Sequence, residues 1–361
     1  LTDTALRTAT AGAEVLTYEP VERLSHEDGV HLVTLRDGAT VRGRTVVLAT
    51  GPWTGNQLLG SPGDGLLTLS KGVHLVVPAA SVPVRAPVVI QVPGQRRILF
   101  AIPWGARTYL GTTDSAFEGD PGSSGVTEAE EAEVLALVQR VLPCDVPPEH
   151  VLSAWSGVRP LVTAKRRGST VELARTHRIV ENEDGVLAIV GGKLTTYRAM
   201  AEDVVDRIVS QLGARPEYGG SPARPCTTHL HPLLPPDLPP HPNADSEIGR
   251  ALASRHGAAT PILLETIDQS PELAAPLVQD LPYRWVEIEH AIAYEGVRHL
   301  DDLLRRRIPL ALTDERLGGR VMHKVAKMLV SARGGSQRDI DEEVERYGRL
   351  VETETRRRPR A

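Results

Sequence analysis

Cysteine, aromatic residues and long apolar runs are scarce in this sequence. Its 361 residues include two cysteines, Cys144 and Cys226, too few for a disulfide framework or a four-cysteine zinc site. No run reaches the roughly 18 uncharged apolar residues that a membrane-spanning helix needs. Positive charge is not in excess, since 41 Lys and Arg against 46 Asp and Glu give a net charge of −5. We therefore expect a cytoplasmic globular protein that binds no nucleic acid. No His, Cys and Asp spacing indicates a metal site.

The first fifty residues have the pattern of a small antiparallel meander followed by a different kind of strand. Alternating runs begin at Glu14–Tyr18 and continue to Thr45, with turn signals at residues 27–29 and 37–38. Residues Val46–Ala49 are continuously apolar, which is typical of a strand buried on both faces of a mostly parallel sheet.

Further strands and one helix are predicted between residues 66 and 185. Thr127 is the expected N-cap of the helix, and Glu130 completes a capping box three residues later. A hairpin is expected across residues 183–185, leading into an apolar strand and then into helical spacing over 194–212. This pattern predicts a mixed α/β fold.

The last third of the chain is predicted to form a separate helical domain, so the fold class is α/β plus α. Nine of the 28 prolines lie between residues 213 and 245, which indicates a linker without regular structure. Ser246, Ser270 and Thr313 are the expected N-caps of helices beyond it. The expected division is residues 1–65 with 186–212, then 66–185, the linker 213–245, and the helical domain 246–361.

Two apolar strands end in small residues, where a ligand can approach the backbone. These junctions are Val46–Trp53 and Val186–Thr196. At the second, Gly191 and Gly192 open a helix whose free N–H groups suit an anionic or electron-rich ligand group. Two ordinary strand-to-helix turns are the alternative, but the occurrence of the pair favours a ligand site.

Basic residues concentrate near the second junction. Residues 151–200 contain eight basic and four acidic residues, a local charge of 8 − 4 = +4 that suits a phosphate ester. A solvated face is the simpler interpretation of the basic run 165–167. Arg159 lies on an apolar strand end, where an unpaired charge would be expensive. His74 alternates into a strand, a position where a structural histidine is the commoner case.

Five motifs occur in an order that is typical of one enzyme family: Ala49–Trp53, Ser70–His74, Arg107–Asp114, Ser156–Pro160 and Gly191–Arg198. From Leu1 to about Arg349 the chain resembles the FAD-dependent glycerol-3-phosphate dehydrogenases. The resemblance implies an FAD-binding domain of the glutathione-reductase/D-amino-acid-oxidase-like type, an antiparallel substrate sheet and a C-terminal helical domain. It also implies oxidation of sn-glycerol 3-phosphate to dihydroxyacetone phosphate, with hydride transfer to the flavin N5.

The same resemblance implies roles for individual residues. Arg159, His74 and Lys193 would be catalytic, with Arg159 facing the reacting hydroxyl. Arg175 would hold the phosphate, with Lys193 and His74 beside it in the substrate pocket. FAD would be bound by residues of the two junctions: Thr50, Gly51, Trp53, Gly192, Lys193, Leu194 and Thr195. Which group accepts the hydroxyl proton is left open, although histidine has the convenient pKa.

The electron acceptor, a quinone or oxygen, is left open as well. A quinone would imply peripheral contact with the inner face of the cell membrane. The basic helical segment 298–307 permits such contact, although a solvent-facing stripe explains it more simply. A homodimer is also compatible with the helical domain.

One family element is not found in the sequence, namely the Gly-x-Gly-x-x-Gly turn that cradles the FAD pyrophosphate. The chain begins at Leu1 rather than methionine. We therefore expect residues upstream, weak or no FAD binding by these 361 residues alone, and an unpaired sheet edge. Two alternatives stay open. One is a related FAD amino-acid or amine oxidase, which would bind a carboxylate, and the other is a non-catalytic fragment lacking the pyrophosphate loop.

Overall fold

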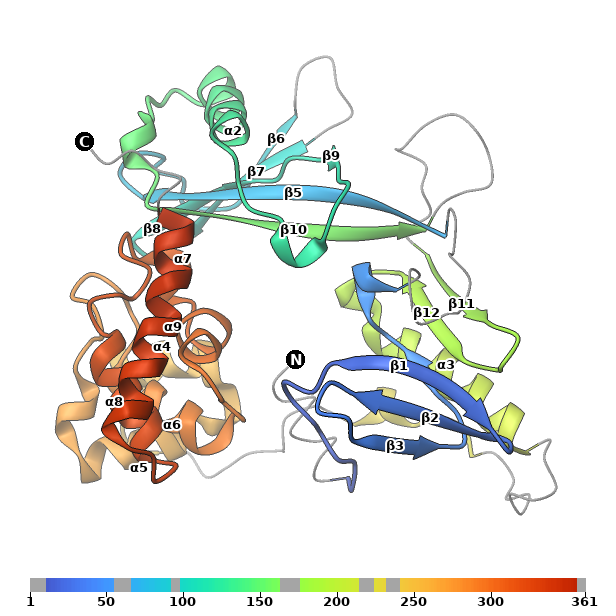
Figure 1. Ribbon diagram of the computed structural model, residues 1–361. Coiled ribbons are helices and arrows are strands. Elements are labelled where there is room, and N and C mark those ends of the chain that lie inside the picture. Colours follow the sequence, from blue (N-terminus) through green and yellow to red (C-terminus); the bar gives the residue numbers. More distant parts are fainter. Residues whose placement is uncertain are drawn as a thin grey trace.

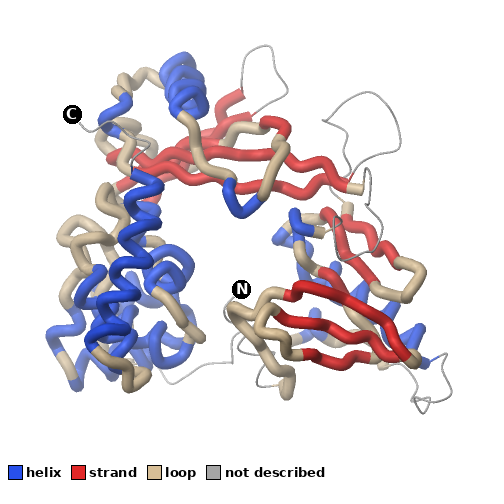
Figure 2. The backbone as a smooth tube through the Cα atoms, viewed as in Figure 1, coloured by secondary structure: helices blue, strands red, loops and turns tan. Residues whose placement is uncertain are grey.

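Three β-sheets and a helical domain make up the protein (Figure 1). The computed structural model describes residues 11–54, 66–91, 98–162, 176–213, 224–231 and 241–355. Strands dominate the first half of the chain and helices the last third. Figure 2 shows most of the helices gathered in one part of the molecule. The predicted α/β plus α class is confirmed.

The first sheet is the predicted meander. Strands β1 (Val21–Glu27), β2 (Val30–Leu35) and β3 (Thr40–Gly43) pair antiparallel in the order β1-β2-β3. The strand predicted at Glu14–Tyr18 is wrong, because this segment docks on the helical domain instead. The Tyr18 hydroxyl donates a 2.8 Å hydrogen bond to Asp302.

The largest sheet has the order β10-β5-β8-β7-β6, and all neighbours are antiparallel. Its strands are β5 (Leu67–Pro78), β6 (Val88–Gln91), β7 (Ile98–Trp104), β8 (Arg107–Gly111) and β10 (Ser153–Val162), and β9 (Ser115–Ala116) also pairs with β5. Alternate residues of β5, including Val73 and Leu75, pack against Val134 and Val138 of helix α2 (Glu128–Val141). Helix α2 therefore covers one face of the sheet, and its predicted Thr127–Glu130 capping box is confirmed.

The third sheet contains the two predicted junction strands. Strand β4 (Val47–Leu48) pairs parallel with β12 (Leu187–Gly191), and β11 (His177–Glu181) pairs antiparallel with β12. Strand β11, which the expected division groups with residues 66–185, therefore pairs with β12 in the mixed sheet. Within the described residues β4 is an end strand of its sheet.

Short helical turns lie in the connections between the strands, and one long helix follows the last strand. The turns are η1 (Gly51–Trp53), η2 (Pro121–Ser123), η3 (Pro148–His150) and η5 (Leu194–Thr196). Turn η5 runs directly into α3 (Tyr197–Gly213). A further turn, η7 (Thr228–Leu230), lies in the proline-rich segment, so the prediction of no regular element there is wrong in its described part.

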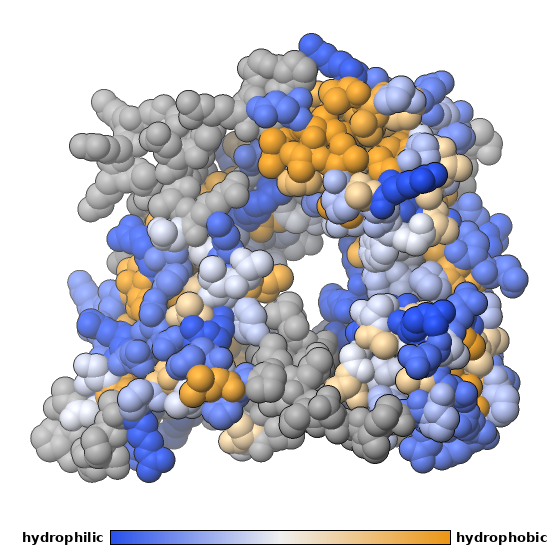
Figure 3. Space-filling view, turned by 180° about the vertical axis from the view of Figure 1, so that it is seen from behind, coloured by the Kyte–Doolittle hydropathy of each residue, from blue (hydrophilic) through white to orange (hydrophobic). Residues whose placement is uncertain are grey.

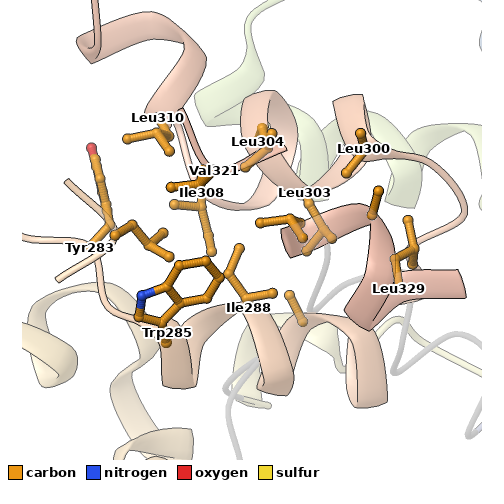
Figure 4. Packing of buried hydrophobic residues seen from close by; sticks show 14 of the residues in the cluster. Tyr283, Trp285, Ile288, Leu300, Leu303, Leu304, Ile308, Leu310, Val321 and Leu329 are labelled. Atoms are coloured by element: carbon orange, nitrogen blue, oxygen red, sulfur yellow. The ribbon is translucent and has the colours of Figure 1, made fainter. Parts of the chain in front are cut away.

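The helical domain encloses its own core. Its elements are α4 (Glu247–His256), η8 (Gly257–Ala259), α5 (Thr260–Gln269), η9 (Pro271–Ala274), α6 (Trp285–Tyr294), the π-helical turn η10 (Asp302–Arg307), α7 (Leu310–Thr313), α8 (Met322–Ser331) and α9 (Gln337–Thr355). Figure 4 shows Trp285, Ile288 and Leu303 converging with Leu329 of α8. Ser246 caps α4 as predicted, by accepting from the Gly249 N–H.

The helical domain is attached to one end of the large sheet. Arg107 Nε donates 2.9 Å to the Thr313 carbonyl, and Arg107 Nη2 donates 2.6 Å to Asp280. The Ser153 hydroxyl, at the start of β10, donates to the Leu312 carbonyl. Thr313 is thus the end of α7 and not the predicted N-cap. No helix among the described segments is both long enough and apolar enough to cross a membrane.

Candidate functional site

His74, Trp155 and Arg159 project from the face of the large sheet opposite to α2. His74 lies directly opposite Trp155 in the β5–β10 pairing, and Arg159 lies opposite Ser70. Because side chains alternate along a strand, these residues share one face, and Val73 and Leu75 point to the other. Strand register alone therefore brings the predicted catalytic histidine and arginine to one surface.

The His74 ring is held between two neighbours. It stacks on the Trp155 ring with 5.1 Å between centroids and 12° between planes. On the β8 side it lies over Gly111, where a Cβ atom would come within 2.5 Å of His74 Cδ2. Burial, with the Arg159 charge as a second cause, lowers the pKa of His74 to about 4. The imidazole is therefore neutral near pH 7, the form that can accept a proton.

Arg159 is fixed by the loop after β8. Its Nη2 donates 2.8 Å to Thr112 Oγ1, and its Nη1 donates 3.4 Å to the Thr113 carbonyl. Asp114 lies 3.9 Å from Nη1 and supplies a counter-charge. The guanidinium also lies against Gly72, whose missing side chain leaves room for it. The Arg159 side chain is 39% exposed, so it can still meet a ligand.

The first junction reaches the same sheet. The turn η1 follows β4, and Gly51 has a φ of +54°, in the left-handed region that favours glycine. Thr50 and Thr54 join their hydroxyls across this turn at 2.8 Å. Trp53 is 57% exposed, and its Nε1 donates 3.4 Å to Asp120 in the loop between β9 and α2. This contact links the small mixed sheet to the loop between β9 and α2.

The second junction lies beside the end of β10. Gly191 and Gly192 have φ values of +74° and +77°, and a Cβ on Gly191 would come within 2.5 Å of Val162 Cγ2. Arg159 is three residues from Val162 along β10, about 10 Å at the usual strand rise. Leu194 is 68% exposed where η5 begins. Both junctions thus end near the sheet face that carries His74 and Arg159.

The structure brings together some of the predicted residues and not others. His74 and Arg159 share a face, and both junctions, with Thr50, Gly51, Trp53, Gly192, Leu194 and Thr195, adjoin β10 and β12. Lys193 is exposed and, among the described contacts, does not touch His74 or Arg159. Arg175 lies outside the described residues.

Sequence reasoning missed the groups that position the predicted pair. Trp155 stacks on His74, and Thr112 and Thr113 bind the Arg159 guanidinium. Tyr109 adds its ring at 6.2 Å from both His74 and Trp155. The alternation of Trp155 and Arg159 along one strand is the signal that could have assigned Trp155.

The junctions fit a planar heteroaromatic cofactor. Two large apolar side chains, Trp53 and Leu194, are exposed where parallel strands β4 and β12 end, although burial would be favourable for both. The first N–H groups of η5 have no partner within the helix, so they can meet electron-rich ring atoms. Open α/β sheets bind their ligands at this end of their strands.

A mixed sheet with glycine turns at its strand ends faces an antiparallel sheet that carries histidine and arginine, and this is the arrangement that the resemblance to flavin-dependent oxidoreductases predicts. Comparison with known proteins agrees. The chain belongs to the FAD dependent oxidoreductase family, whose model matches residues 1–207. Residues 187–340 match the C-terminal domain of alpha-glycerophosphate oxidase. Membership of an FAD-dependent oxidoreductase family, and with it the FAD cofactor, is thereby confirmed.

Individual relatives point the same way. The chain is 32% identical to glycerol-3-phosphate dehydrogenase 2 of Mycobacterium tuberculosis, over 98% of this chain and 62% of that protein. It is 28% identical to the aerobic glycerol-3-phosphate dehydrogenase of Staphylococcus epidermidis, over 83% and 58%. The chain thus spans about three fifths of the curated relatives' length. The glycerol-3-phosphate dehydrogenase of Bacillus halodurans, complexed with FAD, shares the fold with a TM-score of 0.75 at 22% identity, covering 100% of this chain and 73% of that one.

Proposed function

We propose that this chain is part of an FAD-dependent enzyme that oxidises sn-glycerol 3-phosphate to dihydroxyacetone phosphate. The observation that carries the proposal is the placement of His74 and Arg159 on one sheet face beside the two glycine junctions. The names of the similar dehydrogenases support the substrate. FAD, when bound, supplies a hydride acceptor at its N5 atom.

Arg159 binds and orients the reacting hydroxyl. Thr112, Thr113 and Asp114 hold its guanidinium, so that the remaining N–H donors have a fixed direction. A donor aimed at this oxygen stabilises the negative charge that develops as the proton leaves.

His74 accepts the hydroxyl proton in this proposal. It is neutral before substrate binds, because burial and Arg159 lower its pKa to about 4. A bound dianionic phosphate ester raises that pKa, since a nearby negative charge favours the imidazolium. Oxidation of the alcohol removes two electrons and two protons. The hydride from C2 carries both electrons and one proton, and the hydroxyl supplies the other proton.

Arg175 and Lys193 complete the proposed site. Arg175 would bind the phosphate as a fork of donors, and Lys193, at the start of η5, would lie beside both cofactor and substrate. We further propose that Thr50, Gly51, Trp53, Gly192, Leu194 and Thr195 contact the flavin.

The visible spectrum tests this function. The spectrum is recorded for these 361 residues and for an upstream-extended chain, before and after anaerobic addition of glycerol 3-phosphate. Bleaching of a flavin in the extended chain supports the proposal. Reduction of the flavin only by amino acids or amines would show that the proposed substrate is wrong and that the protein is an amino-acid or amine oxidase. The absence of flavin from both chains would favour a non-catalytic protein.

Arg159→Lys tests the role of the guanidinium. It keeps the charge but loses the forked donors, so turnover should fall about 10²–10³-fold. Arg178→Lys, at an exposed position of β11, is the matched control and should leave turnover unchanged.

We also propose that the enzyme is cytoplasmic and passes its electrons to a quinone or to oxygen. A quinone acceptor would require peripheral contact with the inner face of the cell membrane. Figure 3 shows an apolar area on the side where β6 and β7 lie, and Val89 and Ile98 of these strands are 60% and 43% exposed. This surface supports contact with lipid or with a second copy. Sedimentation with liposomes and light scattering separate the two, while oxygen uptake separates the acceptors.

A further inference from the structure

Three potential metal ligands meet in the helical domain, on elements other than those of the proposed site. His256 ends α4, His290 lies in α6, and Glu295 follows the last residue of α6. One donor atom from each residue lies within 4.8 Å of the other two. The two imidazole rings are nearly perpendicular, at 80°, with 5.7 Å between centroids. Side-chain exposures of 12%, 10% and 17% leave the cluster shielded but reachable.

A buried carboxylate orients the first histidine. Glu287 is 1% exposed, and its Oε1 lies 2.9 Å from His256 Nε2. Arg255 donates to the same carboxylate at 2.7 and 3.0 Å, which holds Glu287 in its ionised form. An ionised carboxylate requires the histidine nitrogen to donate, and in the neutral ring the lone pair is then on Nδ1. A carboxylate behind a histidine is the usual arrangement around a metal-binding imidazole.

The third ligand is held at the helix end while one oxygen faces His290. Arg307 donates to the Glu295 carbonyl at 2.9 and 3.1 Å, and its Nε lies 3.8 Å from Glu295 Oε2. The other oxygen, Oε1, lies 3.9 Å from His290 Nε2, which is too long for a hydrogen bond. Ligands of a tetrahedral zinc ion, with bonds of about 2.0–2.2 Å, stand about 3.4 Å apart. The three donor atoms lie within 4.8 Å of one another, so they would have to approach by up to about 1.4 Å to bind one zinc ion.

We propose that His256, His290 and Glu295 bind one divalent transition-metal ion and that Zn²⁺ is the favoured ion. Two imidazoles and one carboxylate form a nitrogen-rich set that suits zinc and disfavours Mg²⁺ and Ca²⁺, which prefer oxygen ligands. The bound ion ties the end of α4 to the end of α6 and leaves a fourth position for water. The sequence indicated no metal because tertiary packing, rather than a short spacing, assembles these ligands.

Zinc binding by the EDTA-treated full chain tests this site by isothermal titration calorimetry and metal analysis. We expect one Zn²⁺ per chain, and a melting temperature higher by roughly 5 °C at a hundredfold excess over Kd. His290→Ala and Glu295→Gln should each weaken binding at least tenfold and remove the melting shift. His323→Ala, at an exposed histidine of α8, should change neither measurement.

Glu295→Gln preserves side-chain size, so it separates loss of a ligand from loss of packing. Glu287→Gln should weaken binding roughly tenfold, since it acts on His256 and not on the ion. Substoichiometric binding at about 100 µM free Zn²⁺, a concentration far above the Kd of a structural zinc site, would overturn the proposal. Equal affinities of the Glu295→Gln and His323→Ala chains would do so as well. None of these measurements depends on flavin or turnover.

Discussion

Gly72→Ala should separate activity from stability at the Arg159 site. A Cβ atom at residue 72 would lie 2.3 Å from Arg159 Nη2 and 2.4 Å from Thr112 Oγ1. Ordinary contact begins near 3.4 Å, so the guanidinium must move by about 1 Å or more. A displacement of this size in a positioning group costs about 10²-fold in kcat/KM, equivalent to about 2.7 kcal/mol of transition-state stabilisation.

The folding cost of this substitution is small by comparison. Arg159 is long and flexible, so its end can move, and the loss of its two hydrogen bonds costs about 1 kcal/mol each. Alanine in a strand recovers about 0.5–1 kcal/mol relative to glycine. The free energy of unfolding should therefore change by no more than about 2 kcal/mol.

Gly157→Ala is the matched control. Gly157 pairs directly with Gly72 across β5 and β10, and a Cβ there meets nothing within 4 Å. Anaerobic flavin reduction by glycerol 3-phosphate measures activity in both variants of the extended chain. NMR titration gives a second readout, since displacing Arg159 should raise the His74 pKa from about 4 in Gly72→Ala only. Wild-type kcat/KM in Gly72→Ala, or an equal loss in Gly157→Ala, would refute the reasoning.

Three further predictions concern stability. The free energy of unfolding should fall by about 2.5 kcal/mol between pH 6.5 and pH 4, because the His74 pKa is about 4 in the folded chain and 6.5 in the unfolded chain. Urea titrations at several pH values measure this, and His74→Asn should remove the pH dependence in that range. Arg107→Ala should lower the free energy of unfolding, measured by thermal unfolding, by about 2–4 kcal/mol. The side chain of its partner Asp280 is 56% exposed, so Asp280→Ala should lower it by less than about 1 kcal/mol. Glu130→Gln removes the counter-charge 2.8 Å from the buried Lys71 ammonium and should cost about 3–5 kcal/mol by calorimetry. The double variant Lys71→Met/Glu130→Gln keeps an acceptor for the Thr127 cap and should recover most of this cost.

Local signals predicted the local structure well. The Thr127–Glu130 capping box and the N-cap Ser246 are confirmed because each depends on residues within one helical turn. The continuous apolar run at 46–49 correctly indicated a strand in a parallel pair. Tyr18 shows where local prediction fails. Its segment alternates like a strand, but Tyr18 is hydrogen-bonded to Asp302, a residue far away in the sequence.

The candidate site was predictable only in part for the same reason. Motifs indicated His74 and Arg159, but their common face follows from the register of β5 and β10. The other strands of the large sheet lie between these two strands in the sequence, so their pairing is not a local signal. Trp155 and Thr112 have no local signal that connects them to the pair. The cluster of His256, His290 and Glu295 likewise depends on how α4 packs near α6.

Strand β10 connects the helical domain to the second junction, in addition to carrying Trp155 and Arg159. Its first residue, Ser153, is hydrogen-bonded to the helical domain, and its last, Val162, lies against Gly191 of the second junction. Ten residues of extended chain span about 30 Å, and Arg159 lies near the far end. Because β10 pairs with β5 along all ten of its residues, it holds the helical domain and the junction at a fixed separation, with Arg159 between them. The distance between the two ends of this strand is therefore set by backbone pairing and not by the loops that join the domains.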